Sequence, residues 1–264
     1  MRFGLHNWLK FFRVVNLPTV PGDVLVGAAA ATWCVRASLS AQELASVALA
    51  VAASCCIYMF GLADNDIVGA ATDKDRPIPD GEISPGAAKA ARAVCLVAGL
   101  VAVAAVGALP LPSGIALPTA ASALHVFAAL VIAIVAYNRT KRPLLMGLCR
   151  GLNVFMGVAI VAPPLFLPRI LDRAPMRLCV VAAVIAIWTL YIAAVTKYSE
   201  GEEDDPERKR RVGALIGGIV YLQLVALIAF ALVCHANNPL LVTGAVLLVA
   251  LRIVKTLLPK VGAS

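Results

Sequence analysis

Charge is scarce in this sequence. Only 14% of its 264 residues are charged and 6% are aromatic, whereas 61% are hydrophobic, and the mean hydropathy is +0.89. A water-soluble domain needs far more polar surface than these residues can supply. The composition therefore excludes a soluble protein and predicts one membrane domain that covers residues 1–264.

Clusters of cysteine or histidine are missing as well. The seven cysteines are scattered through apolar runs, and Cys55 and Cys56 are adjacent, which suits neither a disulfide nor a zinc site. The three histidines, His6, His125 and His235, form no group. We therefore interpret the cysteines as small packing residues and expect no metal site built from either residue type.

Carboxylates are few, and their placement is uneven. Twelve of the fifteen fall within residues 64–82 and 200–207. We call the segments around them the first acidic loop (64–86) and the second acidic loop (196–211). Like charges crowded together repel one another unless something positive lies between them. Two acidic loops beside a hydrophobic bundle therefore predict a site for hard divalent cations and, with them, a phosphate-bearing ligand.

Long apolar runs recur along the chain, each about 20 residues long, which is the length that crosses a bilayer core. Backbone groups in lipid must satisfy one another, so the expected fold is all-α, a polytopic bundle of eight or nine spans. The expected helices are 14–35, 43–63, 87–109, 117–137, 144–166, 175–195, 212–235 and 239–258.

Basic residues divide unequally between the two sides of this bundle. With a cytoplasmic N-terminus, the segments on that side hold seventeen of the 23 lysines and arginines. The opposite side holds only Arg36, Arg169, Arg173 and Arg177. This asymmetry follows the positive-inside rule for an even number of helices. Both acidic loops then face the cytoplasm, where they can meet over one central cavity.

The first acidic loop offers hard oxygen ligands at the end of a helix. Asn65, Asp66 and Asp73 are the predicted Mg²⁺ ligands, since Mg²⁺ prefers one or two carboxylates together with waters and substrate phosphates. Arg76 can contact phosphate oxygens directly. An ordinary solvated loop is the alternative interpretation of the same charges.

Among the polar residues inside expected spans, Asp23, Arg150 and Asn153 are candidates for a common site. Arg150 and Asn153 stand three positions apart, so they share one helix face. An intramembrane arginine is costly unless it is paired or hydrated, which makes this group a hypothesis for an intramembrane polar site. A structural hydrogen bond between helices explains the same residues equally well, and Asp23 is open to both interpretations.

The first acidic loop resembles a motif of the UbiA superfamily of intramembrane prenyltransferases. That motif is Asn-Asp-x-x-Asp-x-x-x-Asp followed by Arg-Pro-x-Pro-x-Gly, and the matching residues are Asn65, Asp66, Asp73, Arg76, Pro77, Pro79 and Gly81. Segments 16–27, 137–143 and 147–153 are similar to other parts of the family pattern. The resemblance covers most of the chain and points particularly to the divergent branch that includes EboC-like proteins.

Two departures from the family pattern stand out. Gly69 occupies the position of the family's middle aspartate. The second motif, usually Asp-x-x-x-Asp, is replaced by residues 200–205, in which Glu200 and Asp204 keep the four-residue spacing that puts two side chains on one helix face.

The resemblance implies an enzyme, a transferase of alkyl groups other than methyl. It would move a prenyl group from a polyprenyl diphosphate to a hydrophobic or aromatic acceptor, with Mg²⁺ assisting the departure of the diphosphate. The implied catalytic residues are Asp66, Asp73 and Lys141, the implied metal ligands are Asn65, Asp66, Asp73, Glu200 and Asp204, and the implied diphosphate contacts are Arg76, Arg139 and Lys141.

Other functions remain open at this point. A non-catalytic relative that binds or transports an isoprenoid or another hydrophobic metabolite is the alternative, and Gly69 and the altered second motif favour it. A phosphatidyl-alcohol transferase is disfavoured because its Asp-Gly-x-x-Ala-Arg signature is absent. We expect a multi-pass protein of a bacterial inner membrane, with both termini in the cytoplasm and no nucleic-acid partner.

Overall fold

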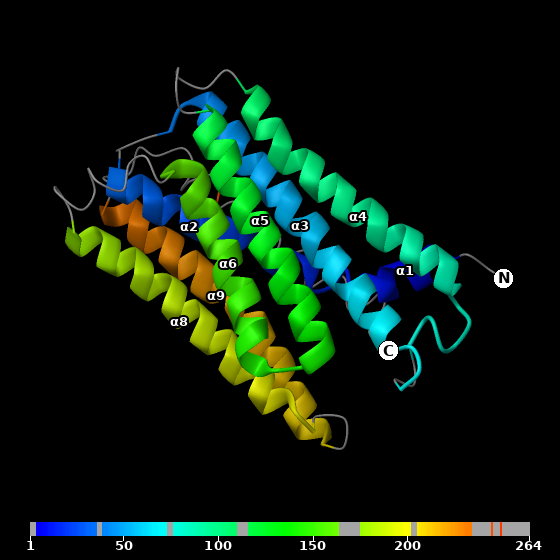
Figure 1. Cartoon of the computed structure of the whole chain (residues 1–264). Coiled ribbons are helices and arrows are strands. Elements are labelled where there is room, and N and C mark those ends of the chain that lie inside the picture. Colours follow the sequence, from blue (N-terminus) through cyan, green and yellow to red (C-terminus); the bar gives the residue numbers. More distant parts are fainter. Residues whose placement is uncertain are drawn as a thin grey trace.

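A computed structural model describes residues 4–35, 39–72, 76–109, 116–163, 175–201 and 205–233, together with Gly244 and Val249. These residues form the all-helical bundle that the sequence predicts (Figure 1). The helices are α1 (Leu5–Phe11), α2 (Pro21–Val35), α3 (Ala41–Gly69), α4 (Pro85–Ala105), α5 (Ala116–Thr140), α6 (Pro143–Val161), α8 (Pro175–Ser199) and α9 (Pro206–Val233), with short 3₁₀ turns at Leu17–Thr19 and Val106–Ala108. The expected helix 239–258 falls outside the described residues, Gly244 and Val249 excepted.

The first expected span, 14–35, starts too early. Residues 12–16 form turns and Leu17–Thr19 a 3₁₀ turn, so the helix begins only at Pro21. Proline lacks a backbone N–H and has a fixed φ, which suits the first position of a helix and disrupts an interior one. The chain therefore bends before α2.

The helices on either side of the two acidic loops are longer than expected. The helix α3 continues to Gly69 instead of ending at residue 63, so Asp64, Asn65 and Asp66 belong to its last turns. The helix α9 begins at Pro206, so the basic run 208–211 is helical. Asp64, Asn65 and Asp66 are thus held on helical backbone.

Six of the described helices are long and apolar enough to cross a membrane: Ala41–Gly69, Pro85–Ala108, Pro118–Thr140, Pro143–Val161, Pro175–Ser199 and Pro206–Val233. Large apolar side chains lie exposed on their outer faces, as Val97 and Val101 do on α4 and Ile187 and Leu190 on α8. A soluble monomer rarely exposes so much apolar surface, but lipid covers it without cost.

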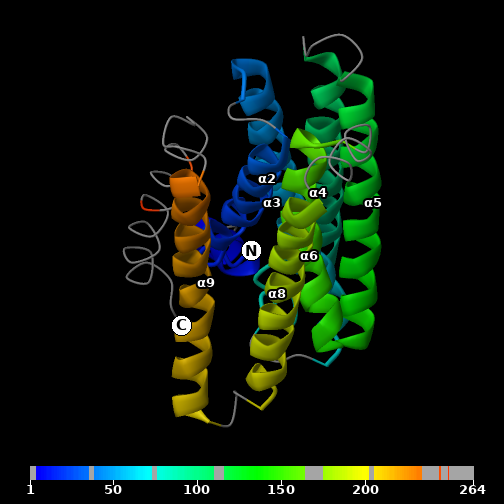
Figure 2. The ribbon, with the colours of Figure 1, turned by 90° about the vertical axis from the view of Figure 1, so that its left-hand side faces the viewer.

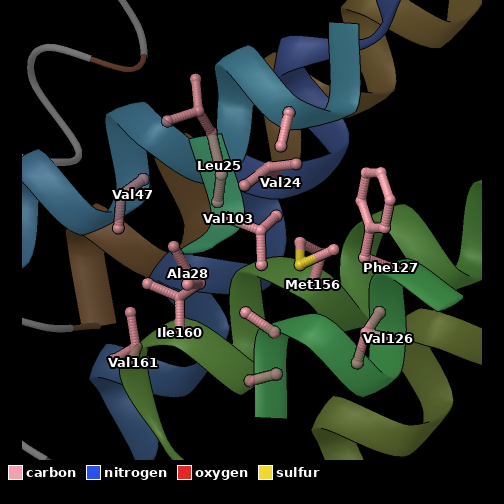
Figure 3. Close-up of a cluster of buried hydrophobic side chains, with 14 of the residues drawn as sticks. Val24, Leu25, Ala28, Val47, Val103, Val126, Phe127, Met156, Ile160 and Val161 are labelled. Atoms are coloured by element: carbon pink, nitrogen blue, oxygen red, sulfur yellow. The ribbon is translucent and has the colours of Figure 1, made fainter. Parts of the chain in front are cut away.

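The bundle is built around α2, whose residues from Pro21 to Thr32 are all buried. Figure 3 shows Val24, Leu25 and Ala28 of α2 within the apolar core, beside Met156 and Ile160 of α6. Val47, Val103, Val126, Phe127 and Val161 complete the labelled cluster. The helix α2 has 15 residues and is in contact with α3, α6, α8 and α9, which together enclose it.

Glycine brings α2 and α6 into backbone contact. A Cβ on Gly27 of α2 would lie 1.8 Å from the carbonyl oxygen of Val154, and a Cβ on Gly157 of α6 would lie 2.0 Å from that of Val24. Each glycine thus faces a backbone carbonyl of the other helix. The two helices therefore lie too close together for a side chain at either position. Membrane helices use small residues in this way to gain packing contacts that lipid cannot replace.

The connections that carry the acidic loops lie at one end of the bundle. In both Figure 1 and Figure 2, the α3–α4 connection, the α5–α6 turn and the α8–α9 turn are gathered at the same end. The two acidic loops are therefore on one side of the helical layer, as the distribution of charge along the sequence predicts.

We predict that Gly157→Ala destabilises the bundle. Its methyl group would collide with the Val24 carbonyl and force α2 and α6 apart, an overpacking defect of about 1–3 kcal/mol. The measurement is the melting temperature of the protein in lipid nanodiscs. Gly213→Ala on α9 is the matched control, because nothing lies within 4 Å of the added Cβ. Equal melting temperatures for the two variants would contradict the close-contact interpretation.

Candidate functional site

The last turns of α3 bring Asn65 and Asp66 under three cationic side chains. Asp66 is only 2% exposed, and its Oδ1 lies 3.3 Å from both Arg13 Nη2 and Arg76 Nη1. Lys141 Nζ donates a hydrogen bond to Asn65 Oδ1. Arg13 comes from the turn after α1, Arg76 from the first acidic loop and Lys141 from the α5–α6 turn. Three segments far apart in sequence therefore deliver positive charge to one point.

The backbone is unusual at two of these three cations. Arg13 has φ 41° and Lys141 has φ 54°, and they are the two non-glycine residues with positive φ in the described part of the chain. Such residues enter the left-handed region only when the surrounding structure holds them there, and they gather at functional sites. The side chain of Arg13 contacts Asp66, and that of Lys141 contacts Asn65. Both strained positions thus serve the Asn65–Asp66 pair, which marks this pair as the centre of the site.

Asp64, two residues earlier, serves a different purpose. It accepts hydrogen bonds from Arg92 Nη1 of α4 at 2.8 Å and from Asn138 Nδ2 of α5 at 2.9 Å. Asn138 Nδ2 also reaches the Gly61 carbonyl at 3.0 Å. Asp64 thereby fastens the end of α3 to both neighbouring helices, and this fixes the position from which Asn65 and Asp66 project.

The short helix α1 lies against this end of the bundle. Phe11 is fully buried and packs with Ala63 of α3 and with Ile78 and Ile83 of the first acidic loop. Lys10 forms ion pairs with Asp80 at 4.0 Å and Glu82 at 3.7 Å. The buried Phe11 anchors the turn that presents Arg13, whereas the partly exposed Lys10 ion pairs add little to this anchoring.

A pocket of about 120 Å³ opens beside the cations. Arg13 and Asn65 lie at its mouth, and its walls are mainly apolar, with contributions from Tyr58, Leu62, Ile134, Tyr137 and Met146. On α3 the lining runs from Asn65 back to Ile57, which at 1.5 Å per residue is a depth of about 12 Å. The site thus combines a cationic mouth with an apolar interior.

Arg150 and Asn153 of α6 line the deep end of this pocket and lead into a buried polar network centred on Asp23. Asp23 Oδ2 lies 2.8 Å from Arg150 Nε, an ion pair by distance whose angle is not that of a hydrogen bond. Asp23 Oδ1 accepts hydrogen bonds from Arg150 Nη2, Trp188 Nε1 and Gln223 Nε2 at 3.1, 2.9 and 2.8 Å. The predicted intramembrane group is therefore paired, and it joins α2, α6, α8 and α9.

The second acidic loop presents exposed, locally paired carboxylates. Glu200 forms an ion pair with Lys197 at 2.6 Å, with both side chains more than half exposed. Asp205 accepts hydrogen bonds from the backbone N–H groups of Arg208 and Glu207, which hold the pKa of its carboxyl below the ordinary value. Asp205 is thus the N-terminal cap of α9, a structural role.

The predicted site residues fall into several groups. Asn65, Asp66, Arg76 and Lys141 come together at the pocket mouth. Arg150 and Asn153 line its deep end, and Asp23 lies behind them, paired with Arg150. Glu200 and Arg139 are exposed at the ends of α8 and α5, and Asp73 and Asp204 lie outside the described residues. Among the described residues, no three Asp, Glu, His or Cys side chains form a group able to hold a metal ion by themselves.

Sequence reasoning missed several participants. Arg13 was not singled out, and its route to Asp66 depends on the bend before α2. Gln223 and Trp188 were not singled out, although an isolated glutamine in an apolar span is a signal of the same kind as Arg150. Asp64 appeared as one more acid of the first acidic loop.

Comparisons with known proteins bear on the fold and the family of the chain. The sequence pattern of the UbiA prenyltransferase family matches residues 24–259. A digeranylgeranylglyceryl phosphate synthase studied in membranes superposes with a TM-score of 0.53 at 16% identity, covering 99% of this chain and 89% of that one. No curated protein sequence matches significantly.

A UbiA homolog from Archaeoglobus fulgidus has the same fold. It superposes with a TM-score of 0.51 at 14% identity, covering 96% of this chain and 87% of that one. Its structure bound to DMAPP and Mg²⁺ gives the same values. Because the family pattern covers most of the sequence and six described helices can cross a membrane, this chain is an integral membrane protein that belongs to the UbiA prenyltransferase family.

Proposed function

We propose that this protein transfers a prenyl group from a polyprenyl diphosphate to a hydrophobic or aromatic acceptor. The observation that carries the proposal is the convergence of Arg13, Arg76 and Lys141 on Asn65 and Asp66 at the mouth of an apolar pocket. Cations bind phosphate oxygens, and apolar walls bind hydrocarbon. An amphiphilic donor matches both parts, with its diphosphate head on the cations and the allylic end of its isoprenoid chain against the apolar wall at the mouth.

Solved structures of a relative support the choice of donor. The Archaeoglobus fulgidus homolog has been determined with DMAPP and Mg²⁺ and with GPP and Mg²⁺. Both ligands are prenyl diphosphates. The cation-lined mouth of this chain has the charge that such a head group requires.

The donor atoms at the mouth fit Mg²⁺. Asn65 supplies an amide oxygen and Asp66 a buried carboxylate, and Mg²⁺ needs only one or two carboxylates when water and substrate phosphates complete its shell. We propose Asn65, Asp66 and Asp73 as the main ligands, with Glu200 and Asp204 of the second acidic loop as further ones. Bound there, Mg²⁺ would neutralise the charge of the departing diphosphate.

The residues of the chain then have distinct tasks. Arg13, Arg76 and Lys141 bind and orient the diphosphate, with Arg139 as an outer contact, while Asp66 holds the two arginines in place. The allylic C–O bond breaks and its electron pair leaves with the diphosphate. The acceptor then forms a bond to the allylic carbon and loses a proton.

Aromatic side chains protect the developing positive charge. Tyr58 and Tyr137 line the pocket, and the Tyr137 ring already faces a cation, with Lys141 Nζ 5.8 Å from its centroid. The negative face of an aromatic ring stabilises a nearby positive charge, and the closed apolar wall keeps water from capturing it.

We predict that Asp66→Asn reduces pyrophosphate release at least a hundredfold when purified protein is given geranyl diphosphate, Mg²⁺ and an aromatic acceptor. The substitution removes the charge that gathers both arginines and would bind the metal. Asp80→Asn is the matched control, because it removes a partly exposed carboxylate of the same loop, 4.0 Å from Lys10. A carrier without catalytic activity would release no pyrophosphate in any variant, including the unmodified chain.

We predict that Arg13→Gln raises the KM for the diphosphate donor by roughly ten- to a hundredfold, the value of one charge-assisted hydrogen bond. Lys10→Gln removes a cation from the same helix that pairs with Asp80 and Glu82 and not with Asp66, and it should leave this KM unchanged. Equal donor KM values for Arg13→Gln and the unmodified chain would show that Arg13 only supports the fold.

A further inference from the structure

The deep end of the pocket is more polar than an isoprenoid chain requires. Arg150 and Asn153 both line it, although both are buried, with 6% and 5% exposure. Ser54 of α3 donates a 2.8 Å hydrogen bond to Asn153 Oδ1 and fixes the orientation of that side chain. A pocket made only for hydrocarbon would gain nothing from a buried guanidinium group at its floor.

Most of the guanidinium group of Arg150 faces away from the pocket. Its Nε lies against Asp23 Oδ2, and its Nη2 donates to Asp23 Oδ1 at 3.1 Å and to the Thr19 carbonyl at 2.7 Å. Within the described part of the chain, no hydrogen bond involves Nη1. Since Arg150 also lines the pocket, Nη1 is the donor that remains for a ligand.

The charges of Arg150 and Asp23 at the deep end of the pocket determine which kind of ligand can bind there. Asp23 already neutralises Arg150, and both groups are buried in the bundle. An anionic ligand would add an uncompensated charge to this apolar interior, at a high cost in desolvation. A neutral oxygen acceptor, such as a hydroxyl or carbonyl group, would take the hydrogen bond without that cost.

The volume of the pocket sets the size of the ligand. At about 120 Å³ it is slightly smaller than the roughly 150 Å³ apolar cavity that holds one benzene molecule in an engineered protein. One aromatic ring therefore fills most of it, so the donor would reach only the mouth with its allylic end, and the rest of its isoprenoid chain would lie outside this pocket. A ring whose oxygen meets the floor would turn its opposite edge toward the mouth, where Arg13 and Asn65 lie.

We propose that the Arg150–Asn153 floor binds the neutral hydroxyl or carbonyl oxygen of the acceptor, so that the enzyme selects uncharged, phenol-like rings over aromatic carboxylates and over rings without an oxygen. The inference rests on the proposed function, because it assigns the acceptor to this pocket. The binding site itself can be tested without any transfer reaction.

The test is calorimetric titration of the full chain in nanodiscs with phenol, toluene or benzoate, without donor, and with empty nanodiscs subtracted. Phenol should bind roughly tenfold tighter than toluene, the value of one hydrogen bond to a charged group, and tighter than benzoate. Equal affinities for phenol and toluene would overturn the proposal, as would a preference for benzoate.

Variants test whether the preference for phenol depends on Arg150 at the deep end of the pocket. Arg150→Lys keeps the charge that pairs with Asp23 but lacks Nη1, so phenol affinity should fall to that of toluene. Tyr191→Phe is the matched control, because it removes an interhelical hydrogen bond to the Leu215 carbonyl outside the pocket, and it should leave the phenol preference intact.

A second variant keeps the test decisive if Arg150→Lys does not fold. Leu130 lines the pocket and is 1% exposed, so Leu130→Phe should fill the cavity and abolish binding of phenol and toluene alike. Phenol binding that survives Leu130→Phe would place the probe elsewhere and refute the proposal. Failure of pyrophosphate release in a chain that still prefers phenol would refute the transferase function and leave this site standing.

Discussion

The architecture depends on one buried ion pair, Asp23 with Arg150. Neither charge could remain inside an apolar bundle alone, since burying an isolated ion costs far more than a domain's net stability. Trp188 of α8 and Gln223 of α9 supply further hydrogen bonds to the same carboxylate. The requirement to satisfy Asp23 therefore fixes the positions of three helices around α2.

The network needs the glycines of the bundle. A Cβ on Gly22 would lie 2.2 Å from the side chain of Gln223, so glycine at that position is what admits Gln223 beside Asp23. Gly27 and Gly157 likewise allow the backbone contact between α2 and α6 that brings Arg150 within reach. The close packing of α2 against α6 and the pairing of Asp23 with Arg150 therefore depend on each other.

Much of this arrangement could be predicted from the sequence. Apolar runs of membrane-spanning length gave the helices, and the distribution of lysine and arginine placed both acidic loops at one end of the bundle. The motif around Asn65 and Asp66 located the mouth of the pocket, and Arg150 with Asn153 were recognised as polar residues sharing a helix face. Each of these signals is local, or follows from periodicity along the chain.

The rest depends on three-dimensional contacts that no local pattern encodes. Asp64 and Asp66 look equivalent in sequence, yet Asp64 fastens α3 to Arg92 and Asn138, while Asp66 gathers Arg13 and Arg76. The difference arises from the direction in which each side chain leaves the last turns of α3. The contribution of Arg13 depends on a bend that hydropathy does not report, because Val14 and Val15 continue the apolar run into α2.

The position of Arg13 has a practical consequence for handling the protein. Arg13, which contacts Asp66, lies two residues after the short helix α1, and that helix is held by the buried Phe11. A bulky fluorescent label attached to α1 would lie close to the turn that presents Arg13. Reporter groups are therefore better attached to another helix than to α1.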